Sequence, residues 1–181
     1  MLAGDLPPPY LVIVATLTVC FPLYHYFGRG RFAAESVAAD ESAQSRQARC
    51  IHYGRCLGFL FLGVVPALLA ALMGLSPAHV GLTWGDPGPS LALLGAVLVC
   101  VVPFIFKHSK TPGAWAEYPE ITRLNWTRRQ VLNSGVTWAI FLTGYEFCFR
   151  GALLFTLNDA LGFWPAIILT NMAYVFVHLP K

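Results

Sequence analysis

Glu146 and Arg150 place an acid and a base within an otherwise apolar part of this chain. Their four-residue spacing puts both side chains on one face of a helix, where they can form an ion pair. No charged residue occurs from Gln130 to Tyr145 or from Gly151 to Asn158. Exposing ionisable side chains to lipid is costly, so we expect both to face the bundle interior, where such residues are usually functional. The alternative is an ion pair that only orients its helix in a bundle.

A second polar face is predicted in the last apolar segment. Asn171, Tyr174 and His178 follow one another at positions i, i+3 and i+7, which lie on one face of a helix. A lone histidine near a helix end is more often a hydrogen-bonded structural residue, but an acid on the preceding segment favours a functional role. Glu146 is then a candidate general base for a water molecule, and neutral His178 can orient that water, stabilise an oxyanion or bind a metal.

Glu146 and His178 can approach each other if their two helices form a hairpin. Measured from a turn near Asn158–Leu161, Glu146 lies about 18 Å along one helix and His178 about 25 Å along the next. Helix tilt and the long glutamate side chain can close this difference of about one turn. The two residues would supply only two metal ligands, whereas a protein metal site normally has at least three. We therefore assign no cofactor, although a divalent metal fits the chemistry of both side chains.

The composition is that of an integral membrane protein. Of the 181 residues, 56% are hydrophobic and 12% are charged, which is far from the composition of an average soluble domain. A spanning helix needs about 20 apolar residues. We therefore expect an all-α fold, a polytopic membrane helix bundle with about five transmembrane helices, at Leu6–Gly28, Cys56–Gly85, Pro87–Phe106, Gln130–Tyr145 (continued by Gly151–Asn158) and Ala160–Pro180.

The basic residues predict the orientation of the chain in the membrane. Lysine and arginine are confined to two connections, Arg29–Arg55 and Lys107–Arg129, apart from Arg150 and Lys181. By the positive-inside rule both connections are cytoplasmic and the N-terminus lies outside. The net charge of +3 is then explained by the orientation of the chain in the membrane. Membrane lipids are the expected partner of these residues, and nucleic acid is not.

Three local expectations concern the connections and the cysteines. Arg29–Arg55 has mixed charges and is predicted to be a solvated linker, with a short surface helix around the alanine-rich Ala33–Glu41 as the alternative. The Gly- and Pro-rich Ser76–Ser90 is predicted to be an irregular loop. Asn125 is a candidate cap for the fourth span. The five cysteines form no close Cys-x-x-Cys pair, so we expect no disulfide framework. The first span lacks a clear cleavage site and is expected to stay in the mature protein.

Two segments together resemble the motifs of the CPBP family, the CAAX proteases and bacteriocin-processing enzymes that are also called the abortive-infection (ABI) family. Tyr145–Gly151 is similar to the first motif, Glu-Glu-x-x-x-Arg, and Tyr174–His178 is similar to the second, Phe-x-x-x-His, with tyrosine in place of phenylalanine. The His-Leu-Pro continuation also resembles the family. The resemblance covers roughly 130–181, which we assign to a partial family core, and 1–129 to N-terminal membrane helices with their cytoplasmic connections.

The resemblance implies a function. Family members are intramembrane endopeptidases in which glutamate and histidine activate water for peptide-bond hydrolysis, and the eukaryotic members trim the last three residues of prenylated CAAX proteins. The matching positions imply three catalytic residues, Glu146, Arg150 and His178. We expect the neighbouring polar side chains to bind substrate or to support these three: Tyr145, Asn171 and Tyr174. The expected substrate is a membrane-embedded or lipid-modified peptide.

Two departures from the family pattern leave alternatives open. Tyr145 occupies the position of the first glutamate, the water activator of studied members, so Glu146 must take that role or the activity is lost. The third motif, His-x-x-x-Asn or His-x-x-x-Asp, belongs to a later span, and the sequence ends at Lys181. The resemblance thus implies an N-terminal portion or a truncated relative. The alternative function is a non-catalytic membrane scaffold or partner-binding protein, and a small transporter is less favoured because no inverted repeat is present.

Overall fold

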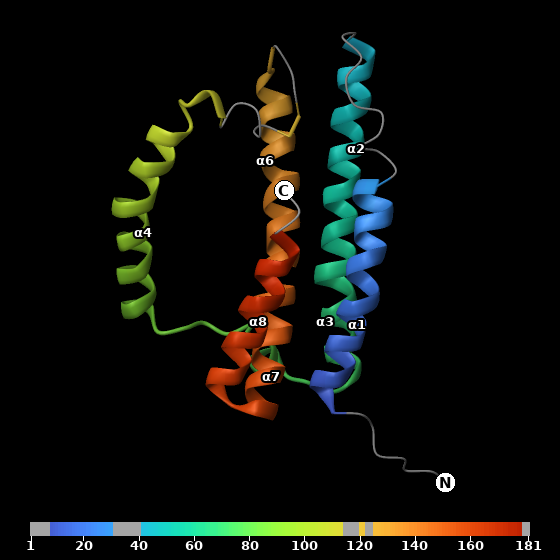
Figure 1. Ribbon diagram of the computed structural model, residues 1–181, viewed down its shortest axis with the longest axis vertical. Coiled ribbons are helices and arrows are strands. Elements are labelled where there is room, and N and C mark those ends of the chain that lie inside the picture. Colours follow the sequence, from blue (N-terminus) through green and yellow to red (C-terminus); the bar gives the residue numbers. More distant parts are fainter. Residues whose placement is uncertain (1–7, 31–40, 114–119, 122–124, 179–181) are drawn as a thin grey trace. The chain divides into compact units, whose positions relative to one another are not determined.

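The computed structural model describes residues 8–30, 41–113, 120–121 and 125–178, which are helical or irregular and include no strand (Figure 1). They divide into two units, one formed by Met1–Leu82 with Asn125–Lys181 and the other by Thr83–Leu124. Four helices are long and apolar enough to span a membrane, and a shorter apolar helix follows them: Pro9–Gly28, Ser45–Leu72, Pro87–His108, Arg128–Leu161 and Phe163–His178. The expected all-α membrane architecture is confirmed.

The first unit begins with two long helices. Helix α1 (Pro9–Tyr24) continues into a π-helical segment, η1 (His25–Gly30). The second helix is continuous through three elements, α2 (Glu41–Phe59), the π-helical η3 (Leu60–Val64) and α3 (Val65–Leu72). A short 3₁₀ helix, η4 (Pro77–Val80), follows it.

The rest of the first unit is a helix hairpin. Helix α6 (Arg128–Glu146) starts with a capping box, in which Thr127 accepts from the Gln130 amide and the Gln130 side chain accepts from the Thr127 amide. The same helix continues through the π-helical η5 (Phe147–Leu153) and α7 (Leu154–Leu161). Gly162, at φ +84°, then turns the chain into α8 (Phe163–His178).

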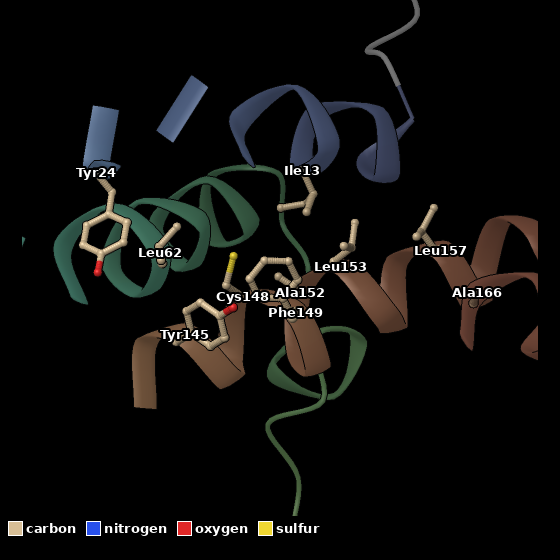
Figure 2. Close-up of a cluster of buried hydrophobic side chains, with 10 residues drawn as sticks. All are labelled: Ile13, Tyr24, Leu62, Tyr145, Cys148, Phe149, Ala152, Leu153, Leu157 and Ala166. Atoms are coloured by element: carbon tan, nitrogen blue, oxygen red, sulfur yellow. The ribbon is translucent and has the colours of Figure 1, made fainter. Parts of the chain in front are cut away.

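The core of the first unit lies where α1, η3 and η5 meet. Ile13, Leu62 and Cys148 are fully buried there, and Figure 2 shows these side chains pointing toward one another from their three elements. Tyr145 and Phe149 extend this cluster toward α8. The buried core therefore holds the helix that carries the site residues of α6 and η5 in place.

A close glycine contact brings the second and fourth spans together. A Cβ on Gly63 would lie 2.9 Å from the Gly144 Cα, a separation that real Cβ atoms avoid. Small residues at such contacts allow membrane helices to approach closely. Because Gly144 precedes the motif at Tyr145, this contact positions the site.

Gly63→Ala is therefore expected to destabilise the protein by about 1–3 kcal/mol, because overpacking forces backbone shifts. Gly135→Ala is the matched control, since nothing lies within 4 Å of a Cβ placed there. The control should be neutral or up to about 1 kcal/mol more stable, given the higher helix propensity of alanine. Unfolding free energies measured in detergent micelles check both values. Equal effects of the two changes would contradict the close contact.

The second unit contains α4 (Pro87–His108), in which no residue is buried. Asp86 caps its N-terminus by accepting from the Gly88 amide at 3.0 Å, so the helix begins in the region expected to be a loop. Its length of 22 residues matches the third expected span.

Three sequence expectations need correction at helix boundaries. The linker predicted for Arg29–Arg55 is wrong at both ends, because η1 continues to Gly30 and α2 begins at Glu41 and runs unbroken into the second span. The part of the predicted linker at 31–40 lies outside the described residues. That span ends at Leu72, well before the expected Gly85. Thr127, and not Asn125, caps the fourth span.

Candidate functional site

The expected ion pair between Glu146 and Arg150 is present. Glu146 is the last residue of α6 and Arg150 lies in η5, so the pair spans the point where the α-helix changes to a π-helix. The Arg150 Nε lies 2.7 Å from the Glu146 Oε2, the short distance of a charge-assisted hydrogen bond. π-Helical turns are rare and frequently occur at functional sites.

Tyr174 of α8 joins this pair from the neighbouring helix. Its hydroxyl donates a hydrogen bond to the Glu146 Oε1 at 3.3 Å. The Arg150 guanidinium carbon lies 5.4 Å from the centroid of the Tyr174 ring, within the range of a cation–π contact. Both carboxylate oxygens are thus oriented, one by each helix of the hairpin.

His178 is held by the same tyrosine. Its Nδ1 donates to the Tyr174 carbonyl at 2.7 Å, and its ring stacks on the Tyr174 ring with centroids 4.7 Å apart. The Tyr145 ring meets the His178 ring edge-on at 5.9 Å. Since Nδ1 carries the proton in this arrangement, neutral His178 keeps an acceptor lone pair on Nε2.

The position of the hairpin turn places Glu146 and His178, which both contact Tyr174, at the same distance along their two helices. Glu146 lies sixteen residues before Gly162 and His178 lies sixteen residues after it. At about 1.5 Å per residue both are about 24 Å from the turn. The offset of about one helical turn that the sequence predicted is therefore absent.

The pair lies on the surface of the first unit. The side chain of Arg150 is 67% exposed and that of Glu146 is 40% exposed. The expectation that both side chains face the bundle interior is therefore wrong for Arg150. The η5 residues that pack into the core, such as Cys148 and Phe149, occupy the opposite face of the helix.

Asn171 does not join this cluster. Its side-chain amide donates to the Ile167 carbonyl of its own helix at 2.9 Å, and the residue is exposed. Within the described ranges there is also no group of three or more His, Cys, Asp or Glu that could hold a metal ion. Glu146 and His178 remain the two candidate ligands that the sequence offered.

Tyr145 lies in the core behind the ion pair. The residue is 6% exposed, and its buried hydroxyl has no hydrogen-bond partner among the residues that the structure describes. Its ring packs against those of Phe149 and Tyr174. Tyr145 therefore supports the ring cluster that carries His178.

Tyr145→Phe is expected to leave stability unchanged or to raise it, because an unpaired buried hydroxyl costs about 1–3 kcal/mol. Tyr174→Phe is the contrasting variant, since it removes the donor to Glu146. Thermal unfolding of both variants in detergent compares them. A clear loss of stability in Tyr145→Phe would show that the buried Tyr145 hydroxyl does make a hydrogen bond.

A second polar cluster, missed from the sequence, joins α2 to α6. Arg55 is only 8% exposed, and its Nη1 donates to the Ser134 carbonyl at 3.1 Å and to the Thr137 hydroxyl at 3.3 Å. The His52 Nδ1 lies 2.9 Å from the same hydroxyl, and the Arg55 guanidinium carbon lies 5.6 Å from the centroid of the Trp138 ring. The sequence signal for this cluster was the i, i+3 spacing of His52 with Arg55 and of Ser134 with Thr137, which places each pair on one helix face.

Comparisons with protein-family models, with curated proteins and with solved structures give no match to this chain.

Proposed function

We propose that this chain is, or belongs to, an intramembrane endopeptidase that hydrolyses peptide bonds of a membrane-embedded or lipid-modified substrate. The observation that carries the proposal is the position of Tyr174, which bonds to the Glu146 carboxylate through its hydroxyl and holds His178 through its ring and carbonyl. An acid and an imidazole on consecutive helices are thus ordered around one tyrosine. The resemblance to the CAAX protease and bacteriocin-processing motifs, on the same residues, supports this class of reaction.

In the proposed reaction Glu146 accepts a proton from water as the oxygen of that water attacks the substrate carbonyl carbon. The π bond of the carbonyl opens to give an oxyanion. When the oxyanion collapses, the carbon–nitrogen bond breaks and the proton passes from Glu146 to the leaving amine. The products are one new carboxyl terminus and one new amino terminus, which balances the atoms of one water molecule.

The neighbouring side chains have separate roles in this proposal. The Nε2 lone pair of His178 accepts a hydrogen bond from the attacking water and so orients it. The Tyr174 hydroxyl and the Arg150 guanidinium fix the direction of the Glu146 carboxylate. Fixed donors near a reacting centre also stabilise negative charge as it develops.

The exposure of the pair suggests how a membrane substrate would approach. Because the Glu146 and Arg150 side chains open onto the surface of the first unit, a peptide held in the lipid phase can reach the carboxylate from the side of the bundle. No soluble substrate has to enter a closed interior. We also propose the orientation with the N-terminus outside, on the distribution of basic residues alone.

A non-catalytic scaffold is the second candidate, and one observation favours it. Each oxygen of the Glu146 carboxylate already has a partner, Arg150 on Oε2 and Tyr174 on Oε1. A carboxylate that is held at both oxygens can act as a fixed structural link between η5 and α8. In that case Glu146 would hold the hairpin together and would transfer no proton.

The test is cleavage of a membrane-tethered reporter peptide by the purified chain in liposomes, with and without a prenyl group on the reporter. The enzyme proposal expects cleavage at a rate that His178→Ala lowers without unfolding the protein. Absence of cleavage by the folded chain, and by any natural form that extends beyond it, would favour the scaffold. Preference for the prenylated reporter would assign the substrate to the lipid-modified class.

A further inference from the structure

Four arginines lie in the N-terminal halves of α2 and α6. Arg46 and Arg49 belong to α2, and Arg128 and Arg129 belong to α6. All four are exposed. None of them makes an ion pair or side-chain hydrogen bond with the residues that the structure describes. We call these four residues the arginine pole.

The pairing of α2 with α6 brings the two halves of the arginine pole to the same level. The helices run in the same direction, because His52 contacts Thr137 and, further along both, Gly63 approaches Gly144. Their N-terminal ends accordingly lie at one end of the first unit (Figure 1). Arg55 fixes this register through its hydrogen bonds to α6.

Distances along the helix axes follow from this register. Arg49 lies six residues before Arg55, and Arg129 lies five residues before Ser134, the residue that Arg55 contacts. At about 1.5 Å per residue both arginines are about 8–9 Å from that contact on the same side. Arg46 and Arg128 lie further out by one turn or less. The arginine pole is therefore a band about one helical turn deep.

Glu41 precedes Arg46 by five residues and Glu120 precedes Arg128 by eight, but no acid follows the arginine pole toward the two spans. No Asp or Glu occurs from Ser42 to Gly85 or from Ile121 to Tyr145. Both helices continue from the band directly into spans of high hydropathy, Ser45–Leu72 and Arg128–Leu161. When both spans cross a membrane, positive charge at their start lies near the lipid headgroups.

We propose that the arginine pole binds the phosphate headgroup of an anionic phospholipid. Guanidinium groups match phosphate oxygens in pairs of parallel hydrogen bonds. Basic residues between membrane helices near the surface are a known setting for such headgroups. The positive-inside rule requires basic residues only somewhere in a cytoplasmic connection. Here the hydrogen bonds of Arg55 also hold the two helices that carry the arginines next to each other. The site is separate from Glu146 and His178 and does not depend on the proposed peptidase activity.

The experiment measures lipid binding to the purified full chain in detergent by native mass spectrometry. Phosphatidylglycerol is titrated as the anionic lipid, phosphatidylcholine as the zwitterionic one, and inorganic phosphate as the free anion. The test variant is Arg46→Gln with Arg49→Gln. The matched control is Lys107→Gln with Lys110→Gln, which removes the same charge at the end of α4.

The proposal expects one saturable phosphatidylglycerol site that the double arginine variant weakens about 30-fold, since each basic residue near the surface contributes about 1 kcal/mol. The double lysine variant should retain the site. Equal weakening by both variants would reduce the effect to diffuse attraction and overturn the proposal. Equal binding of phosphatidylcholine would also overturn it, and saturable binding of inorganic phosphate at the same affinity would reassign the site to a free anion.

Discussion

Glu146→Gln is expected to lower the rate of peptide-bond hydrolysis at least about 100-fold, because glutamine cannot accept the proton of the attacking water. The change keeps the shape of the side chain and an acceptor for the Tyr174 hydroxyl. The loss should therefore appear in kcat with little change in KM. Rates of reporter cleavage in liposomes measure it.

Two variants control this result. Asp159→Asn makes the same carboxylate-to-amide change in α7, on an exposed residue outside the cluster, and should leave the rate unchanged. His178→Ala should lower the rate while its thermal unfolding stays close to that of the parent chain. Full activity of Glu146→Gln would contradict the assignment of the general base.

Arg55→Met is expected to cost about 1.5–3 kcal/mol of stability, the usual contribution of hydrogen bonds to a charged group. The substitution removes donors to the Ser134 carbonyl and the Thr137 hydroxyl. It keeps most of the apolar volume beside Trp138. Unfolding free energies in detergent micelles measure the loss.

The matched control is Arg49→Met in the same helix. Arg49 is exposed and lies six residues earlier, so its replacement should change stability by no more than about 0.5 kcal/mol. Losses of the same size in both variants would mean that Arg55 does not act as a specific link between α2 and α6.

The membrane helices were predictable because apolar length alone identifies them. The third span, Pro87–His108, follows the uncharged stretch to within two residues at its end. The start of α2 was not predictable in this way. Glu41–Arg55 is polar, and its helix is continuous with a span that packs against α6. Tertiary packing therefore extends the helix beyond what hydropathy indicates.

The sequence placed Glu146, Arg150, Tyr174 and His178 together correctly, but it also placed Asn171 with them, and Asn171 does not join the cluster. The i, i+4 spacing of Glu146 and Arg150 foretold their ion pair, and helical periodicity placed Tyr174 and His178 on one face. The distances of Glu146 and His178 from the turn were not predictable, because they depend on Gly162 being the turn residue.

The contacts of Arg55 were hidden for a different reason. An arginine at the edge of an apolar stretch is normally expected to extend its charge to the membrane surface. Here Ser134 and Thr137 offer hydrogen-bond acceptors on the adjacent helix. Only the pairing of α2 with α6, which the sequence does not show, reveals that the guanidinium is buried between them.

The central claim, that Glu146 and His178 activate water for peptide-bond hydrolysis, is tested most directly by cleavage in water enriched in oxygen-18. The purified chain is incubated in liposomes with the membrane-tethered reporter, and the new carboxyl terminus is analysed by mass spectrometry. Water activation by Glu146 predicts one oxygen-18 atom in that carboxyl group from a single turnover, and labelled product formed at least about 100-fold more slowly by Glu146→Gln. Absence of cleavage, or labelled product at the same rate from Glu146→Gln, would contradict it.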